Sequence, residues 1–259
     1  MTSIDLNADL GEADNADWAR NEAEMLRYIT SANIACGGHA GTPKSMRHMV
    51  RGAKEHDVAI GAHPAYPDKV HFGRKSMALS EDITAEDLKA SLLEQITTLA
   101  EIAAEEDSFI SYVKPHGALY NDAVVDAEKA NLIAEVIATI DPKLIFMGGP
   151  NCEMGKAAKR HQLKFIAEGF IDRRYTDDGH LQSRNIEGAV LRDQKARLIQ
   201  AKKLVTMQSV TTASGAELPI AVKTLCLHGD SDGAVETARL ARREIEAAGV
   251  KIKAFARVV

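Results

Sequence analysis

Short apolar runs recur along the whole chain, and segments with helical periodicity separate them. Runs of this kind, rich in Ile, Val, Leu and Ala, predict strands. They lie at Ser3–Ala8, Ser31–Cys36, Val58–Ala62, Ile110–Lys114, Lys143–Met147, Lys164–Glu168, Lys223–Leu227 and Val250–Phe255. Because strands alternate with helices from start to finish, the pattern predicts βαβ units and a parallel sheet.

Between the predicted strands, apolar residues recur every three or four positions, which predicts amphipathic helices. One helix begins at Thr42 and has a proline at its first helical position, and another begins at Thr84. Further helices are predicted at Asp126–Ile140, Cys152–His161, Gln194–Leu204 and Ser231–Ala248. A β-hairpin is predicted from Val205–Thr212 and Glu217–Val222, with its turn at Ser214-Gly215.

Seven or eight such units fit a closed or distorted (β/α) barrel better than an open five-stranded sheet, with a doubly wound sheet as the alternative. The sequence has no linker, repeat or low-complexity tract, so residues 1–259 are expected to form one domain. Two polar segments, Tyr66–Asp82 and Gly169–Asp193, are long for connections. Long loops at the carboxyl ends of barrel strands usually carry function.

Charge and cysteine content narrow the class of protein. The net charge is -5 and Lys and Arg are not gathered into a stripe, which argues against a nucleic-acid-binding protein. Three widely spaced cysteines are typical of a reducing cytoplasm, which is the expected location. The N-terminal segment lacks signal-peptide features, and no run reaches the ~18 apolar residues that span a bilayer, so no membrane association is expected.

Polar side chains gather at the predicted carboxyl ends of the strands. Asp5, Asn7 and Asp9 share one face of the first strand, because successive side chains alternate. If that face points into a barrel, three polar groups there are costly unless they are paired, hydrated or bound to a ligand. The alternative is an exposed edge strand with a solvated face. The polar ends of the other strands favour a functional site.

The segment after the fourth predicted strand carries a second polar pair. Lys114 and His116 share a face, and Pro115 biases Lys114 toward an extended backbone. A lysine in a partly buried, carboxylate-lined pocket can anchor an anion or act as a tuned acid or base. The alternative is a lysine paired with a structural carboxylate, and sequence pattern does not separate the two.

Histidines and a cysteine at other strand ends suggest further chemistry. His63, His116 and the carboxylate of Asp9 match a set of two histidines and one carboxylate that can hold a divalent metal. The alternative is histidines that serve as hydrogen-bonded structural residues. Cys36 lies near His39 as a potential nucleophile, but a small buried thiol is the favoured interpretation.

No local motif predicts a nucleotide site. The segment Gly148–Ala157 departs from the phosphate-binding loop in its glycine spacing, and Ala157 stands where a Ser or Thr would hold Mg²⁺. A nucleotide could still bind at helix N-termini, such as the one that follows Gly41-Thr42-Pro43.

At these strand ends the sequence resembles the LamB/YcsF family. The run Val113-Lys-Pro-His-Gly-Ala-Leu-Tyr-Asn121 is highly specific, and further matching stretches keep their order along the chain. They are Asp5–Glu12, Ala32–Gly41, Gly61–Asp68, Phe72–Arg74, Asp172–Tyr175 with Gly179, Leu181 and Arg184, and Cys226–Asp230.

The resemblance implies an α/β fold, a distorted seven-stranded (β/α) barrel similar to glycoside hydrolase and deacetylase barrels. It also implies ATP-dependent opening of the lactam 5-oxoproline to glutamate, performed with partner subunits B and C. ATP is therefore the expected co-substrate, and a divalent metal is a further candidate. Self-association is left open.

The candidate site residues follow from the strand ends and from this chemistry. The expected catalytic core is Asp9, His63, His116 and Lys114, with Asp9, His63 and His116 also as the candidate metal ligands. The expected substrate-binding residues are Asp5, Asn7, Glu12, Asn33, His39, Arg74, Glu168 and Asp230. In this scheme the histidines position a water, and Lys114 or Arg74 holds a carboxylate or phosphate.

The sequence departs from the family pattern at three positions that bear on the substrate. The family usually has phenylalanine at Gly38, aspartate at Thr42 and arginine at Lys75. Two other functions are therefore kept as alternatives: a stand-alone metal-dependent amide or sugar deacetylase, and a non-catalytic component that only binds or channels an intermediate. The first predicts tightly bound metal and activity without ATP, and the second predicts tolerance of Asp9→Glu.

Overall fold

Seven parallel strands close into a barrel in the computed structural model, which describes residues 2–229, 233–256 and 258. The order is β1-β2-β3-β4-β5-β6-β9, and pairing between β1 and β9 closes the ring. All of these pairings are parallel. The strands are β1 Ser3–Leu10, β2 Ser31–Ala35, β3 Ala59–His63, β4 Tyr112–Val113, β5 Ile145–Gly148, β6 Phe165–Phe170 and β9 Thr224–His228. The expectation of a seven-stranded (β/α) barrel is confirmed.

The last predicted strand lies outside the ring. β10, Lys251–Ile252, pairs with the first residues of β1, while β9 pairs with the rest of β1 from Asp5 onward. The predicted hairpin forms from β7, Ser209–Thr211, and β8, Glu217–Pro219. Its first arm begins later than predicted, because Val205 still belongs to the preceding helix and is buried against the core.

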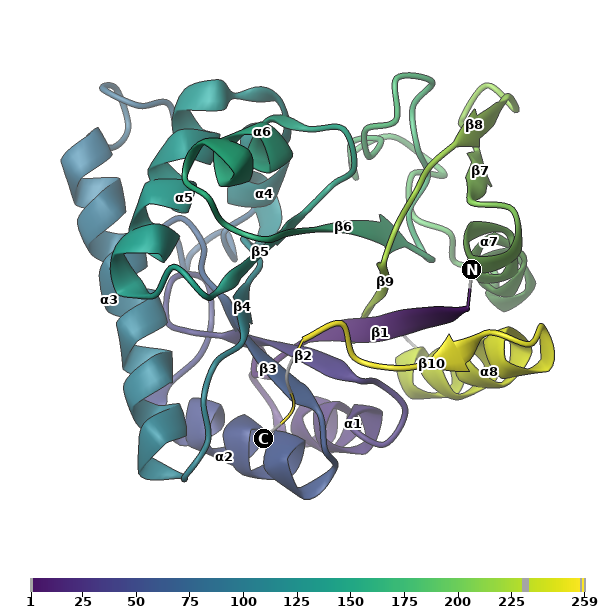
Figure 1. Ribbon diagram of the computed structural model, residues 1–259, viewed down its shortest axis with the longest axis horizontal. Helices are drawn as coiled ribbons and strands as arrows, with labels where there is room; N and C mark the ends of the chain where they lie inside the picture. The colour runs from purple at the N-terminus through teal and green to yellow at the C-terminus, as the bar shows by residue number, and fades with distance from the viewer. Residues whose placement is uncertain (1, 230–232, 257, 259) are drawn as a thin grey trace.

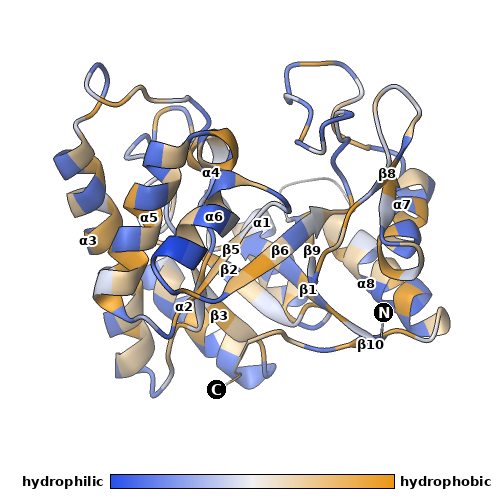
Figure 2. Ribbon diagram, turned by 45° about the horizontal axis from the view of Figure 1, so that its top comes forward, coloured by the Kyte–Doolittle hydropathy of each residue, from blue (hydrophilic) through white to orange (hydrophobic). Residues whose placement is uncertain are grey.

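Helices cover the outside of the barrel (Figure 1). Two of them were not predicted: α1 is mainly polar and buries few side chains, and α4 begins on a glycine without a side-chain cap. The helices are α1 Ala16–Met25, α2 Pro43–Glu55, α3 Ala85–Glu105, α4 Gly117–Val125, α5 Ala127–Ile140, α6 Glu153–Arg160, α7 Gln194–Thr206 and α8 Ala234–Ala247. Helices α3, α5 and α6 show alternating hydrophilic and hydrophobic stretches along their length (Figure 2).

Two apolar clusters hold the barrel. The larger lies between the strands and the helices and includes the outward face of β1, where Ile4, Leu6 and Ala8 are buried. The smaller lies inside the barrel and consists of Ala59, Tyr112, Ile145, Met147 and Ile166, with part of the C-terminal segment, including Phe255, packed against it. Apolar side chains therefore fill one end of the barrel interior and leave the opposite end to polar groups.

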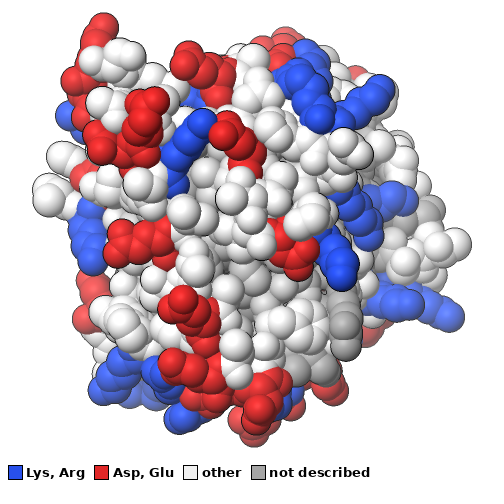
Figure 3. All heavy atoms as spheres, turned by 60° about the vertical axis from the view of Figure 1, so that its left-hand side comes forward, with Lys and Arg blue, Asp and Glu red and all other residues white. Residues whose placement is uncertain are grey.

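The surface over α2, α3 and α5 mixes charges of both signs. Figure 3 shows acidic and basic side chains interspersed on this face, with no continuous basic stripe. Some form bridges between helices: Lys89 lies 2.8 Å from Glu135, and Arg51 lies 2.7 Å from Glu106. Among the described residues, no helix combines the length and the apolar composition that crossing a bilayer requires.

Candidate active site

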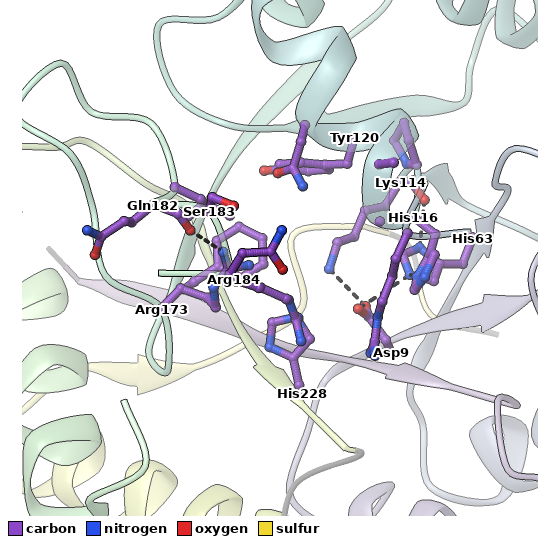
Figure 4. Close-up of a pocket in the computed structure, with 18 residues that line it drawn as sticks. Asp9, His63, Lys114, His116, Tyr120, Arg173, Gln182, Ser183, Arg184 and His228 are labelled. Atoms are coloured by element: carbon purple, nitrogen blue, oxygen red, sulfur yellow. Dashed lines mark hydrogen bonds and ion pairs between the residues drawn. The ribbon is translucent and has the colours of Figure 1, made fainter. Parts of the chain in front are cut away.

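A cavity of about 340 Å³ opens at the carboxyl ends of the barrel strands (Figure 4). Asp9 at the end of β1, His63 at the end of β3, and Lys114 and His116 after β4 line one side. The loop that follows β6 forms another wall. It contributes Arg173, Leu181, Gln182, Ser183, Arg184 and Asn185 to the lining. The long polar loop that the sequence predicted to carry function therefore borders this cavity, although its individual residues were not among the predicted site residues.

The inward face of β1 is fully buried, which excludes the exposed edge strand. Asp5, Asn7 and Asp9 are 1%, 0% and 6% exposed, respectively. The Asn33 amide donates hydrogen bonds of 2.7 Å to Asn7 Oδ1 and to Asp9 Oδ1, and the Tyr112 hydroxyl donates to Asn33 Oδ1 at 2.7 Å. These bonds compensate for burial and orient Asp9 toward the cavity.

Asp5 lies deepest in this row. It accepts hydrogen bonds from the hydroxyls of Thr30 at 2.7 Å and Ser31 at 2.6 Å, and a third from Thr224. Burial raises the pKa of Asp5 to about 6, although these hydroxyls lower it in part. Asp5 therefore takes up a proton more readily than an ordinary carboxyl group.

Lys114 lies between two buried carboxylates. Its Nζ is 2.8 Å from Asp9 Oδ1, 3.0 Å from Glu168 Oε1 and 3.2 Å from Cys226 Sγ. Burial alone would lower the pKa of Lys114, but the neighbouring carboxylates more than offset it and raise this pKa well above its usual value. Burial also raises the pKa of Asp9, but the neighbouring His63 and Lys114 outweigh it and hold that pKa well below its usual value. Lys114 is therefore an ammonium group paired with a carboxylate.

Next to Asp9, three histidines surround the carboxylate of Glu12. Glu12 Oε1 is 2.8 Å from His39 Nε2, 3.3 Å from His116 Nδ1 and 4.0 Å from His63 Nε2. The rings of His39 and His116 are stacked with centroids 3.5 Å apart. Among the described residues, these four side chains are the group able to hold a metal ion, with their ligand atoms within 4.8 Å of one another.

Burial sets the charge of this cluster. It lowers the pKa of His39 to about 3, and it lowers the pKa of His116 well below the usual value, with help from the neighbouring histidines. Both rings are therefore neutral at neutral pH, and each keeps one nitrogen lone pair available to a cation or a proton.

A second group lies across the cavity. His228 Nδ1 is 2.7 Å from Asp172 Oδ2, and Arg184 Nη2 is 2.7 Å from His228 Nε2. Because an arginine can only donate, Nε2 of His228 accepts that bond, and the ring proton lies on Nδ1 and is donated to Asp172. Burial raises the pKa of Asp172, but His228 outweighs it and brings this pKa to about 2. The carboxylate thus fixes the tautomer of a base facing the cavity.

The predicted substrate-binding residues do not all line the main cavity. Glu168 lines a smaller cavity of about 210 Å³ that shares Tyr120 and Phe170 with the first one. Arg74 borders the first cavity and also a third, beside Glu12 and His39. Asp230 lies outside the described residues. Asp5, Asn7 and Asn33 lie beneath the first cavity and are not part of its lining.

The three departures from the family pattern are local. At Gly38, a Cβ atom would meet Gln95 Oε1 at 2.4 Å and the Ala65 carbonyl at 2.9 Å. Gln95 uses its amide to bond both backbone groups of Ala65, so it occupies the space beside Gly38. Thr42 caps α2, and Lys75 is exposed and does not line the first cavity.

Two further sequence signals can now be placed. Cys36 is buried, and burial raises the pKa of its thiol to about 12, as the favoured interpretation of a structural thiol requires. Asp172, Arg173, Arg184 and His228 were missed as site residues. A signal that could have found them was present in the sequence: all four fall in the stretches that match the family, and Asp172, Arg173 and Arg184 also lie in the long polar loop.

Several known proteins match this chain over almost its whole length. It is 41% identical to a 5-oxoprolinase A subunit of Agrobacterium fabrum, over 99% of each chain, and 42% identical to the 5-oxoprolinase A subunit of Mycobacterium leprae, over 98% of this chain and all of that one. A lactam utilization protein from Thermus thermophilus has 37% identity, a TM-score of 0.88 and coverage of 98% and 100%.

More distant structures share the fold alone. A module of the pneumococcal exo-β-D-N-acetylglucosaminidase StrH superposes with a TM-score of 0.55 at 10% identity, over 97% of this chain and 86% of that one. The model of the LamB/YcsF family matches residues 4–259. The chain therefore belongs to the LamB/YcsF family.

Proposed function

We propose that this chain is the A subunit of an ATP-hydrolysing 5-oxoprolinase, which opens 5-oxo-L-proline to L-glutamate together with partner subunits B and C. The observation that carries the proposal is the full-length match to relatives named as 5-oxoprolinase A subunits, at 41% and 42% identity. The cavity supports it independently, because its size and its mixture of cations, carboxylates and imidazoles suit a small, charged lactam.

The chemistry explains why ATP and a water site are both needed. A five-membered lactam is a resonance-stabilised amide, so water alone attacks it slowly. Transfer of the γ-phosphoryl group of ATP to the lactam oxygen would turn the ring carbon into an electrophile. Attack by one water and cleavage of the carbon–nitrogen bond would give γ-glutamyl phosphate, and hydrolysis of this acyl phosphate by a second water would give glutamate and phosphate. Whichever subunit carries the ATP site, this chain must bind an anionic ring and direct a water to one carbon.

Two sides of the cavity divide these tasks. Arg184 presents a permanently charged fork that matches a carboxylate or phosphate, and Arg74 offers a second one at the cavity border. On the other side, Lys114 neutralises Asp9, which aligns with His63 and His116 to position the attacking water. Asp5, Asn7 and Asn33 are positioning residues that hold Asp9 from below.

Proton transfer is assigned to His228. Once Arg184 turns toward the substrate, Nε2 of His228 is left with a lone pair that can accept a proton from the water. Asp172 accepts the Nδ1 proton and stabilises the imidazolium that forms. The proton is then available to the ring nitrogen as it leaves.

The test is an assay with partner subunits, 5-oxoproline and ATP that measures glutamate and phosphate release. Asp9→Ala and His116→Ala are expected to lower kcat/KM by at least about 100-fold, since each removes a group that orients the water. Glu135→Gln, on the outer surface of α5, serves as the matched control and should leave turnover unchanged. Unchanged turnover in Asp9→Ala and His116→Ala would overturn the assignment of these residues.

The alternative of a stand-alone metal-dependent amide or sugar deacetylase rests on the cluster of Glu12 with three histidines. It predicts hydrolysis of acetylated amides or sugars by the isolated chain, without ATP and with sensitivity to chelators. Turnover of 5-oxoproline that requires both ATP and the partner subunits would exclude it.

A further inference from the structure

The proton positions in the histidine cluster follow from its backbone contacts. His63 Nδ1 lies 2.7 Å from the Lys114 carbonyl oxygen, and His116 Nε2 lies 3.1 Å from the Phe72 carbonyl oxygen. A carbonyl oxygen only accepts, so each of these nitrogens carries the proton of its ring. The other two nitrogens, His63 Nε2 and His116 Nδ1, therefore both present lone pairs when the rings are neutral.

Those two nitrogens face each other at 3.0 Å. Two lone pairs at hydrogen-bond distance repel unless something positive lies between them. The same space is bordered by Glu12 Oε1, 3.3 Å from His116 Nδ1, and by Asp9 Oδ2, 3.3 Å from His63 Nε2. The cluster thus concentrates electron-pair donors and negative charge in a buried volume, which is costly without a cation.

We propose that Glu12, His39, His63 and His116 form a binding site for one divalent first-row transition-metal ion of the Zn²⁺ type. The inference concerns the same cavity as the proposed function, and it rests on that function only for the use made of the ion. The ligand set differs from the one predicted from sequence, because Glu12 and His39 join the two histidines. Asp9 is instead engaged through Oδ1 by Lys114 and by Asn33.

The distances fit this kind of ion. Ligands about 2.0–2.1 Å from a tetrahedral Zn²⁺ are roughly 3.3 Å from one another. Three separations here are close to this value: 2.8 Å from Glu12 to His39, 3.0 Å from His63 to His116 and 3.3 Å from Glu12 to His116. Glu12 and His63 are 4.0 Å apart, and all four ligand atoms lie within 4.8 Å of one another. Small shifts of these side chains would complete the geometry.

The surroundings match a metal centre in two further respects. Ligating histidines usually donate the opposite ring nitrogen to a carbonyl or carboxylate, and His63 and His116 both do so. His39 Nε2 lies 2.8 Å from Glu12 Oε1, which accepts its proton in this arrangement, so binding of an ion requires that proton to move to Nδ1. His39 Nδ1 is buried without a hydrogen-bond partner among the described residues, so no other donor occupies the position that the proton would take. Three imidazoles select transition metals over Mg²⁺, which prefers oxygen ligands.

The cluster lies between two cavities. Glu12 and His39 border a cavity of about 670 Å³, whereas His63 and His116 border the one described above. The larger cavity provides an entry path that does not require the substrate cavity to open. When bound, the ion would polarise an oxygen atom facing the substrate cavity.

The experiment measures metal binding by the isolated full chain. After chelation and dialysis, Co²⁺ is added as a spectroscopic substitute and Zn²⁺ as its competitor, with Mg²⁺ as the negative probe. We expect about one equivalent of Co²⁺, visible absorption bands typical of imidazole coordination, and displacement by Zn²⁺ but not by Mg²⁺. Absence of these bands at millimolar Co²⁺ would overturn the proposal, whether or not the chain supports lactam hydrolysis with its partners.

Variants then identify the ligands. Glu12→Gln and His39→Ala should weaken Co²⁺ affinity by more than the roughly 10–100-fold that loss of an outer-shell partner causes. His228→Ala, which removes a cavity histidine outside the cluster, is the matched control and should bind normally. If Asp9→Asn abolishes binding while Glu12→Gln and His39→Ala do not, the set predicted from sequence replaces the one proposed. Circular dichroism confirms that each variant is folded.

Discussion

Lys114 shows how one side chain organises the polar end of the barrel. Its ammonium group is almost fully removed from water and lies between Asp9 and Glu168. A buried charge is tolerated only when partners compensate for its lost hydration, and here two carboxylates share one cation. Burial raises the pKa of Glu168 as well, although Lys114 lowers it in part. The two interpretations of Lys114 are therefore not exclusive, because it is paired and it also borders the cavity.

Lys114→Met should destabilise the protein by about 3–5 kcal/mol, because two buried carboxylates lose their partner. Urea unfolding monitored by circular dichroism measures the change. The double variant Lys114→Met/Glu168→Gln should recover at least about 1 kcal/mol of that loss, because one of the stranded charges is removed. Additive effects of the two substitutions would show that Lys114 and Glu168 do not interact.

The deepest carboxyl group should leave a signature in the pH dependence of stability. Burial raises the pKa of Asp5 from 3.8 to about 6, so its stabilising contribution is complete below pH 3.8 and is lost as the pH rises through 6. At 1.36 kcal/mol per pKa unit, the loss amounts to about 3 kcal/mol. The unfolding free energy of the unmodified chain minus that of Asp5→Asn should fall by this amount from pH 3 to pH 7. A flat difference would contradict the shift.

At the scale of elements, the cap of α2 sets where that helix begins, and the loop after β6 places side chains over the cavity. The N-terminus of α2 has a capping box, in which the Thr42 side chain accepts from the Ser45 amide at 3.1 Å and Ser45 Oγ accepts from the Thr42 amide at 2.8 Å. Aspartate, which the family usually has at this position, can accept the same amide bond. The departure at Thr42 is thus explained as a change of capping residue that keeps the helix start.

Thr42→Ala should therefore lower the unfolding free energy by about 1 kcal/mol, whereas Thr42→Asp should change it by less than about 0.5 kcal/mol. Thermal unfolding of the three proteins side by side makes the comparison. Equal loss in both variants would mean that the cap does not stabilise α2.

The loop after β6 holds Arg184 over the cavity, and its side chain is exposed apart from its bond to His228. Arg184→Ala should lower kcat/KM for 5-oxoproline by about 10–100-fold, mainly through KM, because a charge-assisted contact with the substrate is lost. The melting temperature should change little, since exposed substitutions of this kind cost less than about 0.5 kcal/mol. An unchanged KM would place the anion contact at Arg74 instead.

For the whole molecule, the two ends of the barrel have opposite roles. Apolar residues and the C-terminal segment close one end, where the rings of Phe255 and Tyr112 lie 5.1 Å apart. The same tyrosine reaches up through its hydroxyl to Asn33 and so connects this core to the row beneath Asp9. Stability at one end and the geometry of the site at the other are linked through Tyr112.

Phe255→Ala should destabilise the protein by about 1–2 kcal/mol, as expected for a partly buried aromatic side chain. Because residues 1–259 are predicted to form one domain, the loss should shift a single cooperative urea transition without splitting it. Val70→Ala, at a position 89% exposed, is the control and should leave the midpoint unchanged. A second transition would contradict the single domain.

The sequence by itself determined the alternation of strands and helices, the placement of Asp5, Asn7 and Asp9 on one face of the first strand, and the family. These are local or order-dependent properties, since side-chain alternation and helical periodicity are set by neighbours along the chain. Helix α1 was not predicted, because it is mainly polar and few of its apolar residues recur at helical spacing. Strand β4 is only two residues long, which is too short for a clear alternation of side chains.

Only the tertiary structure decided which side chains meet. Closure of β1 against β9 brings Cys226 beside Lys114, and the turn after β1 brings Glu12 to His39 and His116. Such contacts depend on strand register and on loop paths, which no spacing along the chain encodes. The tautomers of His63, His116 and His228 likewise depend on backbone oxygens and side chains from other elements. Glu12 and His39 as candidate metal ligands, and His228 as the base facing the cavity, therefore emerged only from the folded barrel.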